Sequence, residues 1–279
     1  MKKISRRSFL AAAGLSVAAL ALTACGGSSA STASSVASSA ASSEAASTSA
    51  AAGELTTVEA GKLTMATNAA FPPYEMTTDA GEFEGIDIET AQAIADKLGL
   101  ELQIDDMDFD AALLSVQQGK ADIVMAGVTV TDERKAVMDF SDSYATGIQS
   151  IIVPEGSDIA SPDDLAGKKI GTQRGTTGYI YCTDDFGEDA VVAYDDGLTA
   201  VQALNNGQVD AVVIDNAPAQ EFVAANPGLV ILDTSYAEED YAIGMAKGSS
   251  LEDVVNAALE ELKADGTLQS IVDKYITAE

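Results

Sequence analysis

Residues 100–126 read LELQIDDMDFDAALLSVQQGKADIVMA, and this stretch decides the fold class. Its apolar residues predict a strand at 100–104, an amphipathic helix at 109–118 and a second strand at 121–126. A helical connection between two strands is what parallel pairing requires. The stretch therefore predicts an α/β fold.

The same alternation continues on both sides of this stretch. Further strands are predicted at 63–68, 148–153, 169–173, 191–194, 211–214, 229–232 and 241–246. Further helices are predicted at 88–98, from residue 176 onward, and at 198–205, 218–225, 251–264 and 268–275. Such alternation implies mainly parallel sheets with helices on both faces. Two stretches, 144–149 and 233–240, are interpreted as passages between two lobes.

The composition excludes several classes of protein. The 279 residues include 15 Lys and Arg against 44 Asp and Glu, no His and two Cys. So acidic a chain repels nucleic acid and anionic lipid head groups. Without His there is no Ser-His-Asp or Cys-His apparatus, and one Cys beyond Cys25 cannot build a thiolate zinc site. We expect no nucleic-acid partner and no metal site.

The first 25 residues are predicted to be a lipoprotein signal peptide. Four basic residues precede a short apolar run at 10–22, which is too short to span a bilayer as a helix. The run ends in Leu-Thr-Ala-Cys at 22–25, which resembles the lipobox of bacterial lipoproteins, in which the Cys is lipidated. Arg6 and Arg7 also resemble a twin-arginine signal, so this route and the general secretory route both stay open. The Ser/Ala-rich stretch at 26–53 predicts a flexible linker.

Ligands of open parallel sheets bind beyond the carboxyl ends of the strands, so residues in those places are candidates for a site. Arg134 is one of them. If Thr131 caps the short helix that follows, Arg134 is the third helical residue, where the helix dipole disfavours a cation. Its guanidinium either pairs with Asp132 or Asp139, or binds an anion in the cleft as a fork.

Further residues could complete such a site. Thr129 and the backbone N–H groups near Gly127 would add donors to the same anion. The glycine-rich turn at 171–178, with a helix starting at Thr176, is either an ordinary turn or an anion site. Asp215 follows an apolar strand and either caps the next helix or receives a ligand ammonium.

Two aromatic residues follow the first two strands. Phe71 and Phe109 either pack in the core or line a pocket around the aliphatic part of a ligand, with Asn68 as a polar contact. An Arg fork, a helix N-terminus and Thr hydroxyls suit a carboxylate, whereas Asp suits an ammonium. Together with apolar walls, these groups predict a free α-amino acid as the ligand.

Residues 61–275 resemble the polar amino-acid receptors of ABC importers, and glutamine-binding members in particular. The resemblance rests on MAGVTVTDERK at 125–135 and on DFSD at 139–142. It implies the type II periplasmic-binding-protein fold, with two α/β lobes joined by a two-segment hinge. The first lobe is expected at 54–145 and 237–279, and the second at 146–236.

The resemblance also implies roles for the site residues. Arg134 is expected to hold the ligand α-carboxylate, and Asp215 its α-amino group. The expected ligand-binding residues are Asn68, Phe71, Phe109, Gly127, Thr129, Arg134, Thr176, Thr177 and Asp215. Asn68 stands where basic-amino-acid and glutamine receptors usually carry Asp, which makes a cationic ligand less expected and leaves glutamine, other neutral polar amino acids or cystine open.

The predicted function is therefore capture and delivery. A monomeric, exported lipoprotein, anchored through Cys25 to the outer face of the cell membrane, would pass its amino acid to a permease with cytoplasmic ATPases. No cofactor and no catalytic residue is expected. A dehydratase-type enzyme and a sensory receptor on the same fold are the alternatives.

Overall fold

The computed structural model describes residues 55–276. The predicted signal peptide at 1–25, the lipidation site Cys25 and the linker at 26–53 lie outside these residues. Between residues 55 and 276, no helix combines the length and the apolar character that crossing a membrane requires.

The first lobe is built on a five-stranded sheet in the order β5-β1-β6-β14-β7. These strands are β5 (Glu101–Asp106), β1 (Lys62–Thr67), β6 (Ile123–Val124), β14 (Gly244–Ala246) and β7 (Met138–Phe140). β1 is parallel to β5 and β6, whereas β14 runs antiparallel to β6 and β7. The helices of this lobe are α1 (Ile86–Leu98), α2 (Phe109–Gln117), α3 (Asp132–Val137), α7 (Glu252–Ala264) and α8 (Thr267–Tyr275).

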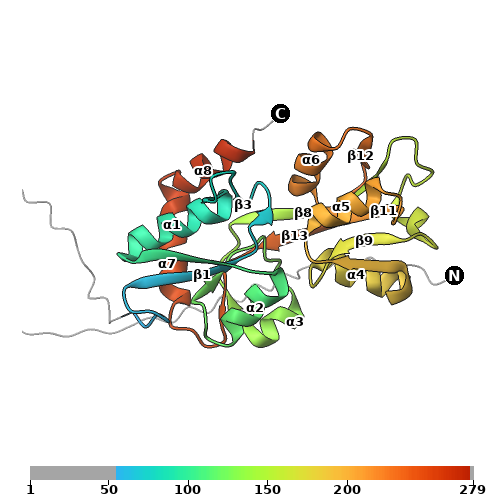
Figure 1. Ribbon diagram of the computed structural model, residues 1–279. Helices are drawn as coiled ribbons and strands as arrows, with labels where there is room; N and C mark the ends of the chain where they lie inside the picture. Colours follow the sequence, from blue (N-terminus) through green and yellow to red (C-terminus); the bar gives the residue numbers. More distant parts are fainter. Residues whose placement is uncertain (1–54, 277–279) are drawn as a thin grey trace, which may run out of the picture. The chain divides into compact units, whose positions relative to one another are not determined.

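The last two helices close the first lobe from the far end of the chain. Figure 1 shows α7 and α8 beside α1, and all three pack against one another. Leu259 and Val255 of α7 are fully buried, as are Ile94 and Ala95 of α1. Burial of these apolar faces joins segments that are more than 150 residues apart in the sequence.

The second lobe is built on a six-stranded sheet. Its strands are β10 (Val191–Tyr194), β9 (Ile170–Gln173), β11 (Ala211–Asp215), β8 (Ala145–Pro154), β12 (Leu229–Ile231) and β13 (Ala237–Tyr241). β9 is parallel to β10 and β11, whereas β8 is antiparallel to its neighbours. Its helices are α4 (Thr177–Phe186), α5 (Gly197–Asn205) and α6 (Asn216–Ala225), with short 3₁₀ turns η1 (Pro162–Leu165) and η2 (Glu188–Ala190).

The strands are rich in apolar residues because helices cover the sheets. Five of the six residues of β1 are buried, and all five of β11. Leu63, Met65 and Ile123 have no exposed surface. Buried parallel strands show continuous apolar runs rather than alternation, which is why the sequence predicts them well.

The two passages predicted at 144–149 and 233–240 overlap β8 and β13, which are the strands of the expected hinge. The first half of β8 pairs antiparallel with β13, from Ala145 opposite Tyr241 to Gln149 opposite Ala237. Figure 1 shows this pair between the helices of the two lobes. The boundaries given above for the lobes stay predictions.

The single strand predicted at 241–246 is wrong. β13 ends at Tyr241 and pairs with β8, whereas β14 starts at Gly244 and pairs with β6 and β7. Ala242 and Ile243 are buried between them, so hydropathy gave no sign of the change from one sheet to the other.

A small three-stranded sheet was also not predicted. It consists of β2 (Ala70–Phe71), β3 (Glu75–Thr77) and β4 (Phe83–Glu84). Strands of two or three residues show no periodicity, so pattern analysis cannot detect them. Gly85 then starts α1 with φ 131°, and a Cβ there would lie 2.2 Å from the carbonyl oxygen of Tyr74.

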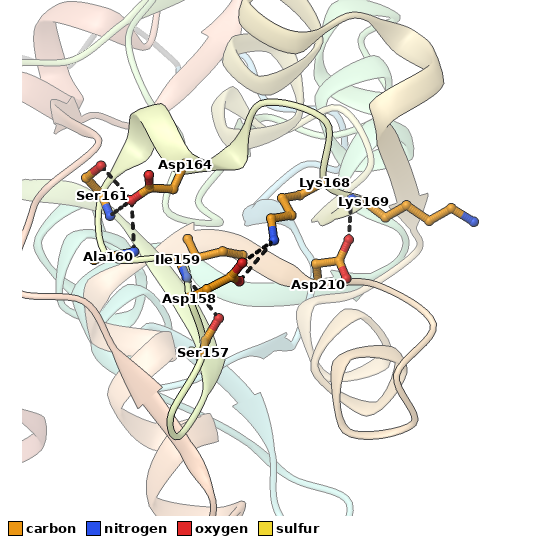
Figure 2. Close-up of polar contacts among 9 residues, drawn as sticks. All are labelled: Ser157, Asp158, Ile159, Ala160, Ser161, Asp164, Lys168, Lys169 and Asp210. Carbon is orange, nitrogen blue, oxygen red and sulfur yellow. Dashed lines mark hydrogen bonds and ion pairs between the residues drawn. The ribbon is translucent and has the colours of Figure 1, made fainter.

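The loop between β8 and β9 is held by polar contacts, which Figure 2 shows. Asp164 accepts a hydrogen bond of 3.0 Å from the backbone N–H of Ser161, which caps η1. Lys168 Nζ lies 2.9 Å from Asp158 Oδ1. Because these carboxylates are exposed, the contacts fix the shape of the loop and add little to stability.

Gly147 is expected to be intolerant of any side chain. A Cβ at Gly147 in β8 would lie 2.5 Å from the ring of Tyr241, which is fully buried. Because neither side can retreat without repacking, Gly147→Ala should lower the free energy of unfolding by about 1–3 kcal/mol. Thermal or urea unfolding measures this loss, with Thr146→Ala at the exposed neighbouring position as the control. Equal stability of the two variants would contradict the expectation.

Candidate functional site

All nine residues that the sequence predicts as ligand-binding line one cavity. They are Asn68, Phe71, Phe109, Gly127, Thr129, Arg134, Thr176, Thr177 and Asp215. The space between the lining atoms is about 300 Å³, including the part that is open to solvent, and residues of both lobes line it. Three lining residues were not in the predicted set: Glu75, Ala126 and Gln173.

Arg134 is held at the cavity by the start of α3. Thr131 caps this helix by accepting a hydrogen bond of 3.1 Å from the backbone N–H of Arg134. The side chain is 8% exposed, and its guanidinium donates to the carbonyl oxygens of Thr129 at 2.7 Å and Gly175 at 3.1 Å. The guanidinium carbon also lies 5.4 Å from the ring centre of Phe109. These contacts fix the orientation of the guanidinium group.

The guanidinium of Arg134 has no carboxylate within 4.0 Å among residues 55–276. Asp139, considered above as its partner, pairs instead with Lys247 at 2.6 Å. Burial lowers the pKa of Arg134, and the negative charge of Glu239 opposes this shift. A buried cation with carbonyl partners alone retains most of its desolvation cost, so the site favours an added anion.

Asp215 lies at the end of β11 and is 7% exposed. Its carboxylate accepts a hydrogen bond of 2.8 Å from Gln149 Nε2 and another from the Tyr241 hydroxyl. Asp215 occupies the N-cap position of α6, as one of the two interpretations expected, but its side chain makes no capping hydrogen bond to this helix. The pKa of Asp215 is raised to about 7, mainly by burial and also by the charge of Glu239, although these hydrogen bonds lower it. A cation in the cavity would stabilise the ionised form.

Two amides meet at another part of the cavity wall. Asn68, in the first lobe, donates from Nδ2 to the carbonyl oxygen of Met107 at 3.0 Å. Its Oδ1 accepts a hydrogen bond of 2.8 Å from Gln173 Nε2, in the second lobe. Both side chains are buried and neutral. The contact joins the lobes across the cleft, and it leaves the amide oxygen of Gln173 as an acceptor.

An acidic pair lies beside Phe71 and Gly127. Asp87 accepts a hydrogen bond of 3.0 Å from the N–H of Gly127, and burial raises its pKa to about 6. Glu75 lines the cavity and is fully buried. Burial, together with the charge of Asp87, raises the pKa of Glu75 well above its usual value. Both effects favour the neutral form of the Glu75 carboxyl.

Glu239 is a functional candidate that sequence reasoning missed. It is 7% exposed, and its Oε2 accepts hydrogen bonds from Thr129, Thr177 and Gln149. The sequence indicates 233–240 only as a passage between the two lobes. The sequence holds no signal for it, because Glu238, Glu239 and Asp240 are all acidic and only the structure shows that Glu239 is buried while the other two are exposed.

The arrangement is suited to holding a ligand with two opposite charges. Arg134 supplies a fixed cation, Asp215 supplies a carboxyl that a cation would ionise, and the amides and aromatic rings are neutral. No group of three or more potential metal-ligating side chains occurs between residues 55 and 276.

Comparison with known proteins gives a consistent result. Residues 63–278 match the model of the bacterial extracellular solute-binding proteins, family 3. The L-cystine-binding protein TcyJ of Escherichia coli (strain K12) is 33% identical over 226 residues, which cover 79% of this chain and 85% of that protein.

Solved structures extend this similarity to the fold. An ancestral arginine-binding protein bound to glutamine is 42% identical, with a TM-score of 0.75, and covers 78% of this chain and 99% of its own. The same kind of ancestral protein bound to arginine is 43% identical, with a TM-score of 0.74, over 77% of this chain and 98% of its own. This likeness confirms the predicted fold class. By sequence and by structure, the chain belongs to the bacterial extracellular solute-binding proteins of family 3.

Proposed function

We propose that the protein captures a free amino acid between its two lobes and delivers it to the permease of an ABC importer. It is a binding protein and not an enzyme, as its family indicates. The observation that carries the proposal is the buried guanidinium of Arg134, which faces a cavity without a carboxylate partner and shares that cavity with Asp215.

The charged groups assign the two ends of the ligand backbone. The α-carboxylate binds to the fork of Arg134, close to Thr129 and Thr177, because a bidentate contact in a dry site is strong and directional. The α-ammonium binds to Asp215, whose carboxylate is oriented by Gln149. Phe71 and Phe109 pack against the carbon chain, with Gly127 and Thr176 completing the wall.

The neutral amides favour a neutral polar side chain. Asn68 and Gln173 offer hydrogen-bonding groups without charge, so glutamine suits them better than a cationic side chain does. Cystine is the alternative, supported by the similarity to the E. coli L-cystine-binding protein. The ancestral relatives carry glutamine in one structure and arginine in another, so a single scaffold of this kind accepts both charge classes.

Capture requires the lobes to close. A ligand that contacts residues of both lobes lowers the free energy of the closed arrangement and shifts the hinge equilibrium toward it. Closure also removes water from around Arg134 and Asp215, which strengthens both charge-assisted contacts. A dissociation constant near 1 μM needs only about 8 kcal/mol of net binding free energy.

The N-terminal sequence indicates where in the cell the protein acts. We propose that Cys25 carries lipid and anchors the exported protein to the outer face of the cell membrane, with residues 26–53 as a tether. The protein acts as a monomer that docks on its permease, which works with cytoplasmic ATPases.

Arg134→Ala should abolish tight binding. Truncating one partner of a buried charge pair costs about 2–5 kcal/mol, which is at least a 30-fold rise in Kd. Isothermal titration with glutamine, cystine, arginine and histidine measures it, after unfolding and refolding to remove bound ligand. Arg174→Ala is the matched control, since the Arg174 side chain is 54% exposed and does not line the cavity. Absence of binding by the unsubstituted protein to every common amino acid would overturn the proposed function.

Affinity should fall as the pH falls below about 7. Asp215 must be ionised to bind an ammonium, and its pKa is raised to about 7 without a ligand. Below that value, binding must release a proton, so Kd rises by up to about tenfold per pH unit. The chain has no His to titrate in this range. Titrations at pH 5, 6 and 7 measure the slope.

Two comparisons identify the group responsible. Asp87, with a pKa of about 6, also titrates here, so Asp87→Asn should keep the slope if Asp215 causes it. The free energy of unfolding of the ligand-free protein should change with pH in the opposite direction from the affinity. A carboxyl with a raised pKa stabilises the fold at low pH, and this contribution is lost as the pH rises through about 7. A slope that disappears in Asp87→Asn would contradict the assignment.

A further inference from the structure

Glu239 is a buried carboxylate that the ligand scheme does not use. It lies on the hinge strand β13, is 7% exposed, and does not line the ligand cavity. No cation lies within 4.0 Å of it among residues 55–276. A buried carboxylate without an ion pair needs strong hydrogen bonds to offset its desolvation cost. The residues that donate hydrogen bonds to Glu239 therefore indicate what this side chain holds together.

One oxygen of Glu239 takes all of these hydrogen bonds, and the donors come from different parts of the molecule. Oε2 accepts from the Thr129 hydroxyl at 3.1 Å, in the first lobe, and from the Thr177 hydroxyl at 2.9 Å, at the start of α4 in the second lobe. Gln149 Nε2, on the other hinge strand β8, donates at 3.0 Å. Two hydroxyls that bond to one oxygen must lie close together, so both bonds exist only at the present separation of the lobes.

The same network reaches the ligand site. The Nε2 group of Gln149 also donates to Asp215 Oδ2 at 2.8 Å. Thr129 and Thr177 both line the ligand cavity, although Glu239 itself does not. Glu239 is therefore placed to align the walls of the cavity without touching the ligand.

We propose that Glu239 is the interlobe clamp of this protein, a positioning residue whose single carboxylate oxygen ties Thr129 and Thr177 together and thereby favours the closed arrangement that binds ligand. The part of the proposal that concerns affinity rests on the proposed function, whereas the part that concerns closure does not. Opening breaks at least one of the two Thr bonds and returns the carboxylate to water. The clamp therefore biases the hinge without locking it.

The first test measures closure without any ligand. Spin labels at Lys120→Cys and Asp184→Cys, both exposed and on different lobes, report the interlobe distance in a Cys25→Ala background. Cys182 is fully buried, so it resists labelling. Glu239→Gln keeps the shape but removes the charge, and it should shift the distance distribution toward longer values. Glu238→Gln is the matched control, because Glu238 is the exposed neighbour on the same strand.

The second test asks whether the shift arises from the clamp. Hydrogen bonds to a charged group are individually strong, so Glu239→Gln should raise the open-to-closed ratio by about tenfold. Thr177→Val should raise it similarly. If both act through one contact, combining them should add little to either alone. Fully additive effects would overturn the clamp, as would a distance distribution in Glu239→Gln identical to that of Glu238→Gln.

The third test connects closure with binding. Kd for the tightest-binding amino acid should rise about tenfold in Glu239→Gln and stay unchanged in Glu238→Gln. Circular dichroism of each variant shows that it is folded. If the unsubstituted protein binds no amino acid but the distance still shifts, the proposed function fails and the clamp stands. If binding is tight but the distance does not shift, the clamp fails and the function stands.

Discussion

A guanidinium that is buried among carbonyl oxygens, with no carboxylate in reach, is the constraint around which the cleft is organised. Arg134 bears this cost because Thr131 fixes the start of α3 and the carbonyl oxygens of Thr129 and Gly175 fix the fork. One of these carbonyls belongs to each lobe. The hydrogen bonds of the guanidinium therefore depend on the distance between the lobes, and the anion that we propose as its partner is an amino-acid carboxylate between them.

Negative charge around this cation is controlled by protonation and by hydrogen bonding. Burial raises the pKa values of Glu75, Asp87 and Asp215, which favours the neutral forms of these carboxyls near the cavity. Glu239 instead takes three hydrogen bonds on one oxygen. A chain with 44 acidic residues thus keeps a cleft that can still admit a carboxylate. Neutral amides at Asn68 and Gln173 then leave the recognition of the ligand side chain to hydrogen bonding.

Much of the fold could be predicted from sequence because its strands are buried apolar runs and its helices are amphipathic. The site residues could be placed together because Arg134 and Asp215 each follow a predicted strand. What escaped prediction lacks such a signal. The short strands β2 to β4 have no period, and the change of sheet at 242–243 occurs inside a continuous apolar stretch. Glu239 was missed because its role depends on Thr129 and Thr177, which are distant in the sequence.

The return of the chain to the first lobe has a consequence for the order in which the protein can be made. β14, α7 and α8 complete the sheet and cover α1, yet they are synthesised after all other described elements. The second lobe, whose elements are nearly contiguous, is complete before them. Domains generally fold as units during synthesis, so the lobe that begins the chain must finish second. The apolar face of α1 stays uncovered until residues 244–275 have been synthesised, and during this interval a chaperone that recognises exposed apolar surface could bind it.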